Sequence, residues 1–172
     1  FNNISHLTFH PQNTSPPLTN YSFLLRVDVE IDWESKVKYL GIYFDKKLIF
    51  ADHVKSVVEK VQKYMRVFYP FICRKSKLLK TTKIILFKVV FQSIMRYASP
   101  VWHCCAATHK NKLQVQQNKI LKMMMDLPFH HSTRKLHQTT KVAPLSDLWE
   151  KQYTKFMESC RNSSNPLISD LS

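Results

Sequence analysis

The stretch VKYLGIYFDKKLIFADHV, residues 37–54, contains the change of pattern that decides the fold. Its first half, VKYLGIYF, is rich in β-branched and aromatic residues, which is typical of a strand. From Asp52 onward the apolar residues recur at helical spacing. Gly41 is the only glycine in the 172 residues, and a glycine inside a strand commonly marks a close backbone approach or a bulge. Tight packing of Gly41 against the following helix is an equally good interpretation.

Two further strand-like runs precede this stretch, at 4–9 and 21–27, with a proline- and asparagine-rich loop between them. Three short strands predict a small sheet or the edge of a larger one, because so few strands rarely fold alone. Four acids then alternate along the chain, which places them on one strand face: Asp28, Glu30, Asp32 and Glu34. They form either a solvated edge that resists aggregation or a carboxylate cluster for a metal ion.

Helical periodicity dominates the rest of the chain. The first predicted helix begins at Asp52 and carries an apolar stripe that ends at Ile72. Further helices are predicted at about 110–126, 132–137 and 146–160. The sequence therefore predicts an α+β fold, in which a small antiparallel β-sheet is followed by a mainly α-helical bundle.

A basic connector, RKSKLLK at 74–80, leads into another predicted helix, which Thr81 caps and which runs to about Tyr97. This helix is apolar almost all round, which predicts burial. Its exceptions, Lys88, Gln92 and Arg96, are spaced by four residues and predict one polar strip.

The net charge of +14 is concentrated in the middle of the chain. Residues 60–125 contain fourteen Lys and Arg and no acid, whereas the remaining twelve basic residues are matched by all twelve acids. Such a block attracts a polyanion, and nucleic acid is the commonest polyanion inside cells. A solvated basic surface without a partner is the alternative.

Several other function classes find no support in the sequence. A Gly-rich phosphate loop is excluded by the single glycine, and the longest apolar run, 84–91, is too short to cross a membrane. The four cysteines form no CxxC pair, and we interpret them as reduced thiols. His130, His131 and His137 are a weak metal candidate, and Met123, Met124 and Met125 are expected to fill the core.

Five segments, taken together, resemble the C-terminal part of non-LTR retrotransposon reverse transcriptases of the jockey type. They are VKYLGIYFDKKLIFADHV (37–54), RKSKLLKTTKIILFKVVFQSIMRYASPVW (74–102), LQVQQNKILKMMMDLPF (113–129), HQTTKVAPLSDLWEKQY (137–153) and NPL (165–167). The family pattern has a KYLGI-like box, an L-x-W/F-x-x-H turn, a basic helix pair that ends in a tyrosine and a tryptophan, a helix before a proline, and a closing helix.

The resemblance implies a division of the chain and a role for each part. Residues 1–48 would be a palm-edge β segment, 49–128 a basic thumb-like region and 129–172 a C-terminal helical region. The box at Tyr39, Leu40 and Gly41 would act as a primer-grip hairpin. The thumb-like region would clamp the duplex through sequence-blind phosphate contacts, for which the candidates are Lys75, Lys77, Lys80, Lys83, Lys88, Arg96, Lys110, Lys112, Lys119 and Lys122.

The family's catalytic aspartates, including an aromatic-Ala-Asp-Asp turn, would precede the segment that corresponds to Phe1. No such turn occurs in these 172 residues. The expectation is thus a reverse transcriptase fragment that grips an RNA:DNA hybrid and contacts the rest of the polymerase chain, with no catalysis and no cofactor of its own. Magnesium would serve the parent enzyme, which is expected in the nucleus and the cytoplasm, and no membrane partner is expected.

Two other hypotheses stay open. The chain is alternatively a stand-alone basic nucleic-acid-binding module, or an inert remnant derived from such an element. Binding of the basic helices to a membrane surface is a lesser alternative.

Overall fold

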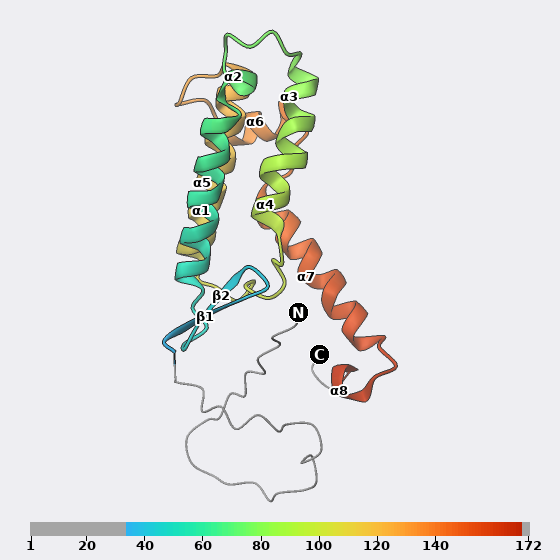
Figure 1. The fold of residues 1–172 in the computed structure, drawn as a ribbon. Coiled ribbons are helices and arrows are strands. Elements are labelled where there is room, and N and C mark those ends of the chain that lie inside the picture. Colours follow the sequence, from blue (N-terminus) through green and yellow to red (C-terminus); the bar gives the residue numbers. More distant parts are fainter. Residues whose placement is uncertain (1–33, 170–172) are drawn as a thin grey trace, which may run out of the picture. The chain divides into compact units, whose positions relative to one another are not determined.

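The computed structural model describes residues 34–169 and shows a β-hairpin followed by helices (Figure 1). The hairpin consists of β1 (Lys36–Tyr39) and β2 (Ile42–Asp45), which pair antiparallel. This confirms the predicted α+β class, with helices in the majority. The strands predicted at 4–9 and 21–27, and the acids Asp28, Glu30 and Asp32, lie outside the described residues.

The predicted continuous strand at 37–44 is wrong, because the chain reverses in its middle. Tyr39 pairs with Ile42, so Leu40 and Gly41 form a two-residue turn. Both have positive φ, 45° and 80°, as a type I′ turn requires. Such a turn matches the right-handed twist of the two strands, and glycine adopts positive φ without the steric cost that a side chain adds. Gly41 is therefore a turn residue and does not interrupt a strand.

The loop between β2 and the first helix is held by the carboxylate of Asp45. It accepts hydrogen bonds from the backbone N–H groups of Lys47, Ile49 and Phe50, at 3.1, 3.0 and 2.7 Å. Burial would raise the pKa of Asp45, but these backbone donors together lower it below the usual value. The loop includes two more positive-φ residues, Leu48 and the buried Phe50 at its end. The hydrogen bonds to Asp45 thus hold the FDKKLIF segment, residues 44–50, in one conformation and fix where the first helix begins.

The helix predicted from Asp52 to Ile72 is present but divided into α1 (Ala51–Val67) and α2 (Tyr69–Ile72). Its predicted stripe is confirmed, since Val54, Val57, Val61 and Ile72 are buried. The division falls just before Pro70, which lacks an N–H group and whose ring clashes with the carbonyl four residues earlier.

The next helical segment consists of α3 (Lys80–Leu86), the π-helix η1 (Phe87–Gln92) and α4 (Ser93–Arg96). It begins at Lys80 without a side-chain cap, so Thr81 does not have the predicted capping role. Neither complete burial nor a single polar strip is observed. Ile85 and Val89 are exposed, whereas Gln92 is buried. The i→i+5 spacing of the π-helix rotates the following residues, so a four-residue spacing no longer keeps side chains on one face.

Four more helices complete the described chain: α5 (Ala107–Met125), α6 (Thr133–Thr140), α7 (Leu145–Arg161) and α8 (Pro166–Ser169). The first three confirm the predicted helices, each with bounds shifted by a few residues, and α8 was not predicted. Met124 and Met125 are buried and Met123 packs against the core, which confirms their predicted role. No helix in the described part is long and apolar enough to cross a bilayer.

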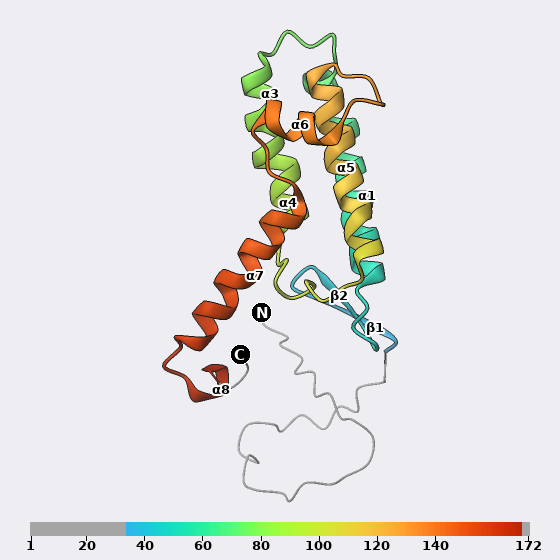
Figure 2. The same cartoon turned by 180° about the vertical axis from the view of Figure 1, so that it is seen from behind.

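α5 lies at the centre of the bundle, because it contacts α1, α3, η1, α6 and α7 (Figure 2). Its buried Gln117 donates a hydrogen bond to the Ala143 carbonyl at 2.9 Å and accepts one from the Leu145 N–H at 3.1 Å. The buried rings of Trp102 and Trp149 meet edge to face, with centroids 5.3 Å apart. Trp149 also donates to the Met95 carbonyl at 3.0 Å, which ties α7 to α4.

Candidate nucleic-acid interface

The KYLGI box forms the tip of the hairpin. Tyr39 and Leu40 are exposed there, and the hydroxyl of Tyr97, just after α4, donates a hydrogen bond to the Leu40 carbonyl at 2.8 Å. A Cβ atom added to Gly41 would lie 3.7 Å from Cε1 of Tyr97, which is an ordinary contact. Positive φ, and not crowding, therefore accounts for the glycine. The contact is neither tight nor made to α1, the helix that follows the hairpin, so the packing interpretation of Gly41 is wrong.

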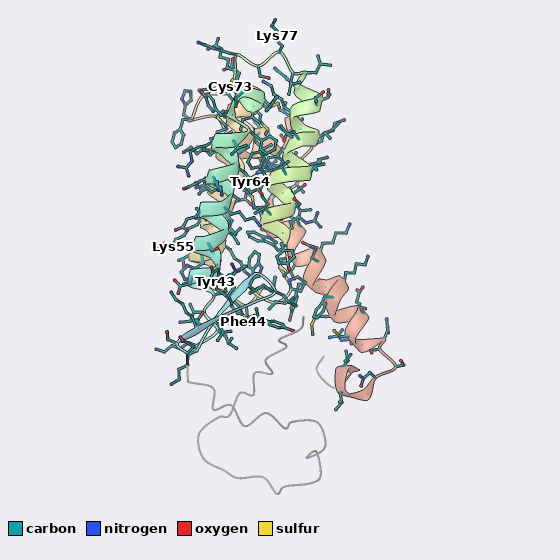
Figure 3. The ribbon with its side chains drawn as sticks, in the orientation of Figure 1. Tyr43, Phe44, Lys55, Tyr64, Cys73 and Lys77 are labelled. Carbon is teal, nitrogen blue, oxygen red and sulfur yellow. The ribbon has the colours of Figure 1, made fainter. Side chains whose placement is uncertain are left out.

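Three of the predicted phosphate-binding lysines, Lys75, Lys77 and Lys80, are exposed on the connector between α2 and α3 or at its end. Figure 3 places Lys77 and Cys73 at the end of the bundle opposite to Tyr43 and Phe44 of the hairpin. The 17 residues of α1 separate the two ends, a length of about 25 Å at 1.5 Å per residue. The structure therefore does not bring the hairpin tip and the connector lysines together.

Two other predicted residues have partners within the fold. Lys83 is only 4% exposed, and its ammonium group donates to the Cys73 carbonyl at 2.8 Å. The half-buried Arg96 donates from Nε to the side-chain carbonyl of Gln152 at 3.0 Å. Both side chains hold the bundle together in this structure, Lys83 at the connector and Arg96 at α7.

The remaining candidates lie on η1 and α5. Lys88, Lys112 and Lys119 are exposed, and Lys110 is half-buried. Lys122 is also half-buried, and its Nζ donates to the Phe129 carbonyl at 2.6 Å and lies 5.5 Å from the centre of the Phe129 ring. The exposed lysines thus occupy the connector, η1 and α5, with no single point where all converge.

Few of these positive charges are neutralised within the protein. Among residues 34–169, Arg74 is the only Lys or Arg of the 60–125 block that forms an ion pair, with Asp126 at 3.0 Å. A shallow hollow along α7 is lined by three carboxylates, from Asp147, Glu150 and Glu158, which would repel phosphate. The same hollow is also lined by Lys151 and Lys155, so α7 carries charges of both signs. The acid-free basic block lies on the other helices.

The described residues contain no group of three or more His, Cys, Asp or Glu side chains that could hold a metal ion. His137, one of the three histidines considered above, instead contacts the Val142 carbonyl at 2.8 Å and the Asn118 side chain at 3.0 Å. The magnesium expected for a parent polymerase thus finds no ligand set in this part of the chain.

Two features of the surface were not predicted from the sequence. One is the hydrogen bond of Tyr97 to the hairpin turn, which joins positions 57 residues apart. The other is a group of exposed aromatic rings at the connector end: Tyr69, Phe71 and Phe129. The aromatic residues themselves were visible in the sequence, but Tyr69 and Phe71 are not part of the apolar stripe predicted for the first helix, and the sequence assigned them no role.

Comparison with known proteins relates the sequence that forms this hairpin and basic helical bundle to one class of protein. The chain is distantly homologous to RNA-directed DNA polymerases of transposable elements of the jockey and X-element kind, which confirms the resemblance at this level.

Three of these relatives come from Drosophila melanogaster. The probable RNA-directed DNA polymerase from transposon X-element is 23% identical over 144 residues, which are 84% of this chain and 16% of the relative. The probable polymerase from transposon BS is 25% identical over 90% of the chain and 18% of the relative. The polymerase from mobile element jockey is 28% identical over 78% of the chain and 15% of the relative.

The chain thus spans less than a fifth of the length of each of these relatives. No protein-family model matches the sequence, and no solved structure is significantly similar to it.

Proposed function

We propose that this chain is the thumb-like part of an RNA-directed DNA polymerase and that it grips the RNA template and DNA primer duplex. The observation that carries the proposal is the homology to such polymerases over 78–90% of the chain. The bundle's exposed lysines, which lack ion-pair partners among the described residues, supply the chemistry that such a grip needs.

Phosphate contacts suit a polymerase because they position a duplex without reading its sequence. On this proposal the exposed members of the predicted set contact the backbone of the hybrid, namely Lys75, Lys77, Lys80, Lys88, Lys112 and Lys119. Lys110 and Lys122 are half-buried and contribute to a smaller extent. Lys83 and Arg96 act indirectly, because their donors are used within the fold.

The hairpin tip has a separate role in this proposal. Tyr39, Leu40 and Gly41 form a primer-grip-like turn, which the Tyr97 hydroxyl fixes in place. The palm-edge, thumb-like and C-terminal divisions at 1–48, 49–128 and 129–172 belong to the same proposal. Catalytic aspartates and the magnesium ions they bind would be supplied by other parts of the polymerase, so we derive no catalytic step from the residues of this chain.

The test is the binding of the 172-residue chain to an RNA:DNA hybrid as a function of salt. Six to ten phosphate contacts lower the affinity by roughly three to five powers of ten between 50 and 200 mM salt. Each of the changes Lys77→Gln, Lys88→Gln and Lys112→Gln should make the slope of log K against log salt shallower by about one. Binding that does not depend on salt, or no binding by a folded chain, contradicts the proposal.

Lys151→Gln is the matched control, because Lys151 is equally exposed but lies on α7 beside Glu150 and the other carboxylates of the hollow. Its slope should equal that of the parent chain. A cooperative thermal melt of the same sample argues against the inert-remnant alternative, which is expected to aggregate through its exposed palm edge.

A further inference from the structure

The connector end of the bundle, opposite the hairpin, brings together two segments that are far apart in the sequence. We define the apical surface as residues 69–80, from α2 through the connector, and 119–131, from the end of α5 into the following loop (Figure 1). The ion pair between Arg74 and Asp126, at 3.0 Å, joins the two segments directly. The apical surface is therefore one continuous region of the protein.

This surface exposes three aromatic rings that the fold uses only in part, since Phe71 still contacts the ring of Phe68, with centroids 6.3 Å apart. Phe129 is 89% exposed, Tyr69 is 55% exposed and Phe71 is 51% exposed. Their neighbour Phe68, by contrast, packs into the bundle, where its ring meets those of Tyr64 and Phe91. Exposed apolar groups gathered in one region of a surface mark a candidate binding site.

Phe129 is also held in position by a cation. Lys122 Nζ donates to the Phe129 carbonyl at 2.6 Å and lies 5.5 Å from the ring centre. These two contacts restrain the backbone and the ring, although the ring itself faces solvent. Less conformational entropy is lost when a restrained ring binds its partner.

The charges around the rings are almost all positive. Asp126 is the only acid in the two segments, and it is already paired with Arg74. The basic residues of the two segments are Arg74, Lys75, Lys77, Lys80, Lys119 and Lys122. An anionic partner with flat apolar groups therefore complements this surface.

We propose that the apical surface binds an unpaired nucleic-acid strand, with bases stacked on Phe129, Phe71 and Tyr69 and phosphates on the lysines. This combination of a basic surface and aromatic rings is how proteins hold single strands without reading their sequence. A duplex does not satisfy the rings, because its bases are already stacked within the helix. The inference rests on the proposed function in that both assign nucleic acid to Lys75, Lys77, Lys80 and Lys119. It differs in the ligand, an unpaired strand, and in the use of the aromatic rings.

The experiment compares two ligands of the same length with the 172-residue chain, by fluorescence anisotropy. One is an oligothymidylate of about twelve nucleotides, within the range that a basic groove with stacking rings covers, and the other is an RNA:DNA hybrid. Phe129→Leu keeps an apolar side chain but removes the ring, so it should weaken single-strand binding by about tenfold, equivalent to losing one stacked base. Hybrid binding should change by less than about twofold.

Phe129→Trp and Phe156→Leu are the matched controls. The Trp variant keeps a stacking ring, so its single-strand affinity should equal or exceed that of the parent, and its added fluorescence should be quenched by the oligothymidylate but not by the hybrid. Phe156 is 48% exposed on α7, far along the chain from the apical surface, so its removal should leave both affinities unchanged.

The outcomes separate the two proposals. Salt-sensitive hybrid binding combined with an unaffected Phe129→Leu overturns the apical site and leaves the proposed function standing. Selective loss of single-strand binding in Phe129→Leu, together with hybrid binding that does not depend on salt, supports the apical site and contradicts the proposed function. If Phe129→Leu reduces binding to phosphatidylserine vesicles but not to the oligothymidylate, the surface binds membranes and the inference is wrong.

Discussion

Replacement of His53 by leucine is predicted to stabilise the protein. His53 lies in the first turn of α1, is 2% exposed, and has its ring 5.7 Å from that of Trp102. Neither ring nitrogen has a hydrogen-bond partner among the described residues. Burial also lowers the pKa of His53, because charging the ring would require solvation that the site does not provide.

The expected gain follows from the unpaired nitrogens. A buried polar group without a partner costs about 1–3 kcal/mol, and leucine fills a similar volume without that cost. His53→Leu should therefore raise the free energy of unfolding at pH 8 by about 1–3 kcal/mol, less any loss from imperfect packing. For a chain of this size each kcal/mol raises Tm by about 2–4 °C.

The pH dependence has a definite sign. The folded pKa of His53 lies below its usual value of 6.5, so below pH 6.5 the unfolded chain binds a proton that the folded chain does not. Stability from this group is present above pH 6.5 and lost as the pH falls toward the folded pKa, at about 1.4 kcal/mol per pH unit. The difference between His53→Leu and the parent chain should therefore widen between pH 7 and pH 5.

Urea unfolding followed by circular dichroism at several pH values measures both effects. His130→Leu is the control, because His130 is exposed and its removal should change stability by less than about 0.5 kcal/mol. A His53→Leu variant that is less stable than the parent at pH 8, with an unchanged m-value, would show that the imidazole nitrogens make useful bonds. A difference that does not vary with pH would refute the titration argument.

Two further predictions concern residues of the interface. Gly41→Ala should lower the free energy of unfolding by about 1–2 kcal/mol, because φ is 80° there. Tyr97→Phe removes the hydrogen bond to the Leu40 carbonyl and should lower it by about 1 kcal/mol. Thermal melts measure both effects, and a Gly41→Ala variant as stable as the parent would contradict the assigned turn. Lys83→Met should cost about 1–3 kcal/mol because it removes a charge-assisted hydrogen bond to the Cys73 carbonyl, which keeps only the Ser76 N–H, at 3.2 Å, as a donor. Lys88→Met, at an exposed position, should change stability by less than about 0.5 kcal/mol. Equal effects of the two changes in chemical denaturation would refute the separation of structural from phosphate-binding lysines.

The helices were predictable because each carries a local periodic signal. In α5 the buried Leu113, Gln117, Ile120 and Met124 recur at helical spacing, which is the pattern that predicts a helix at 110–126. The signal failed where a backbone irregularity intervened. Pro70 divides the first helix, and the π-helix at Phe87–Gln92 rotates Gln92 away from the face of Lys88. Periodicity assumes a uniform 3.6-residue turn, so it cannot anticipate where that turn changes.

The hairpin illustrates a different limit of sequence interpretation. VKYLGIYF has the residues of one strand, and the Leu-Gly pair lacks the Asn or Asp that usually precedes glycine in a type I′ turn. Local preference therefore gave no strong turn signal at Leu40. The hydrogen bond from Tyr97, 57 residues later in the sequence, stabilises the turn from outside. Only a long-range contact explains why the positive φ of Leu40 is tolerated, and no local pattern contains that information.

In the basic block, too, long-range contacts decide the role of each residue, and the local sequence does not reveal them. Its residues appear equivalent in the sequence, yet Lys83 is buried and binds the Cys73 carbonyl at the start of the connector, whereas Lys75 and Lys77 on that connector are exposed. A lysine that fixes the connector reduces the freedom of the exposed lysines beside it. They consequently lose less conformational entropy when they bind a phosphate. The effect of Lys83 on nucleic-acid affinity would then act through the position of its neighbours, and removing it should weaken single-strand and hybrid binding together, unlike the removal of the Phe129 ring.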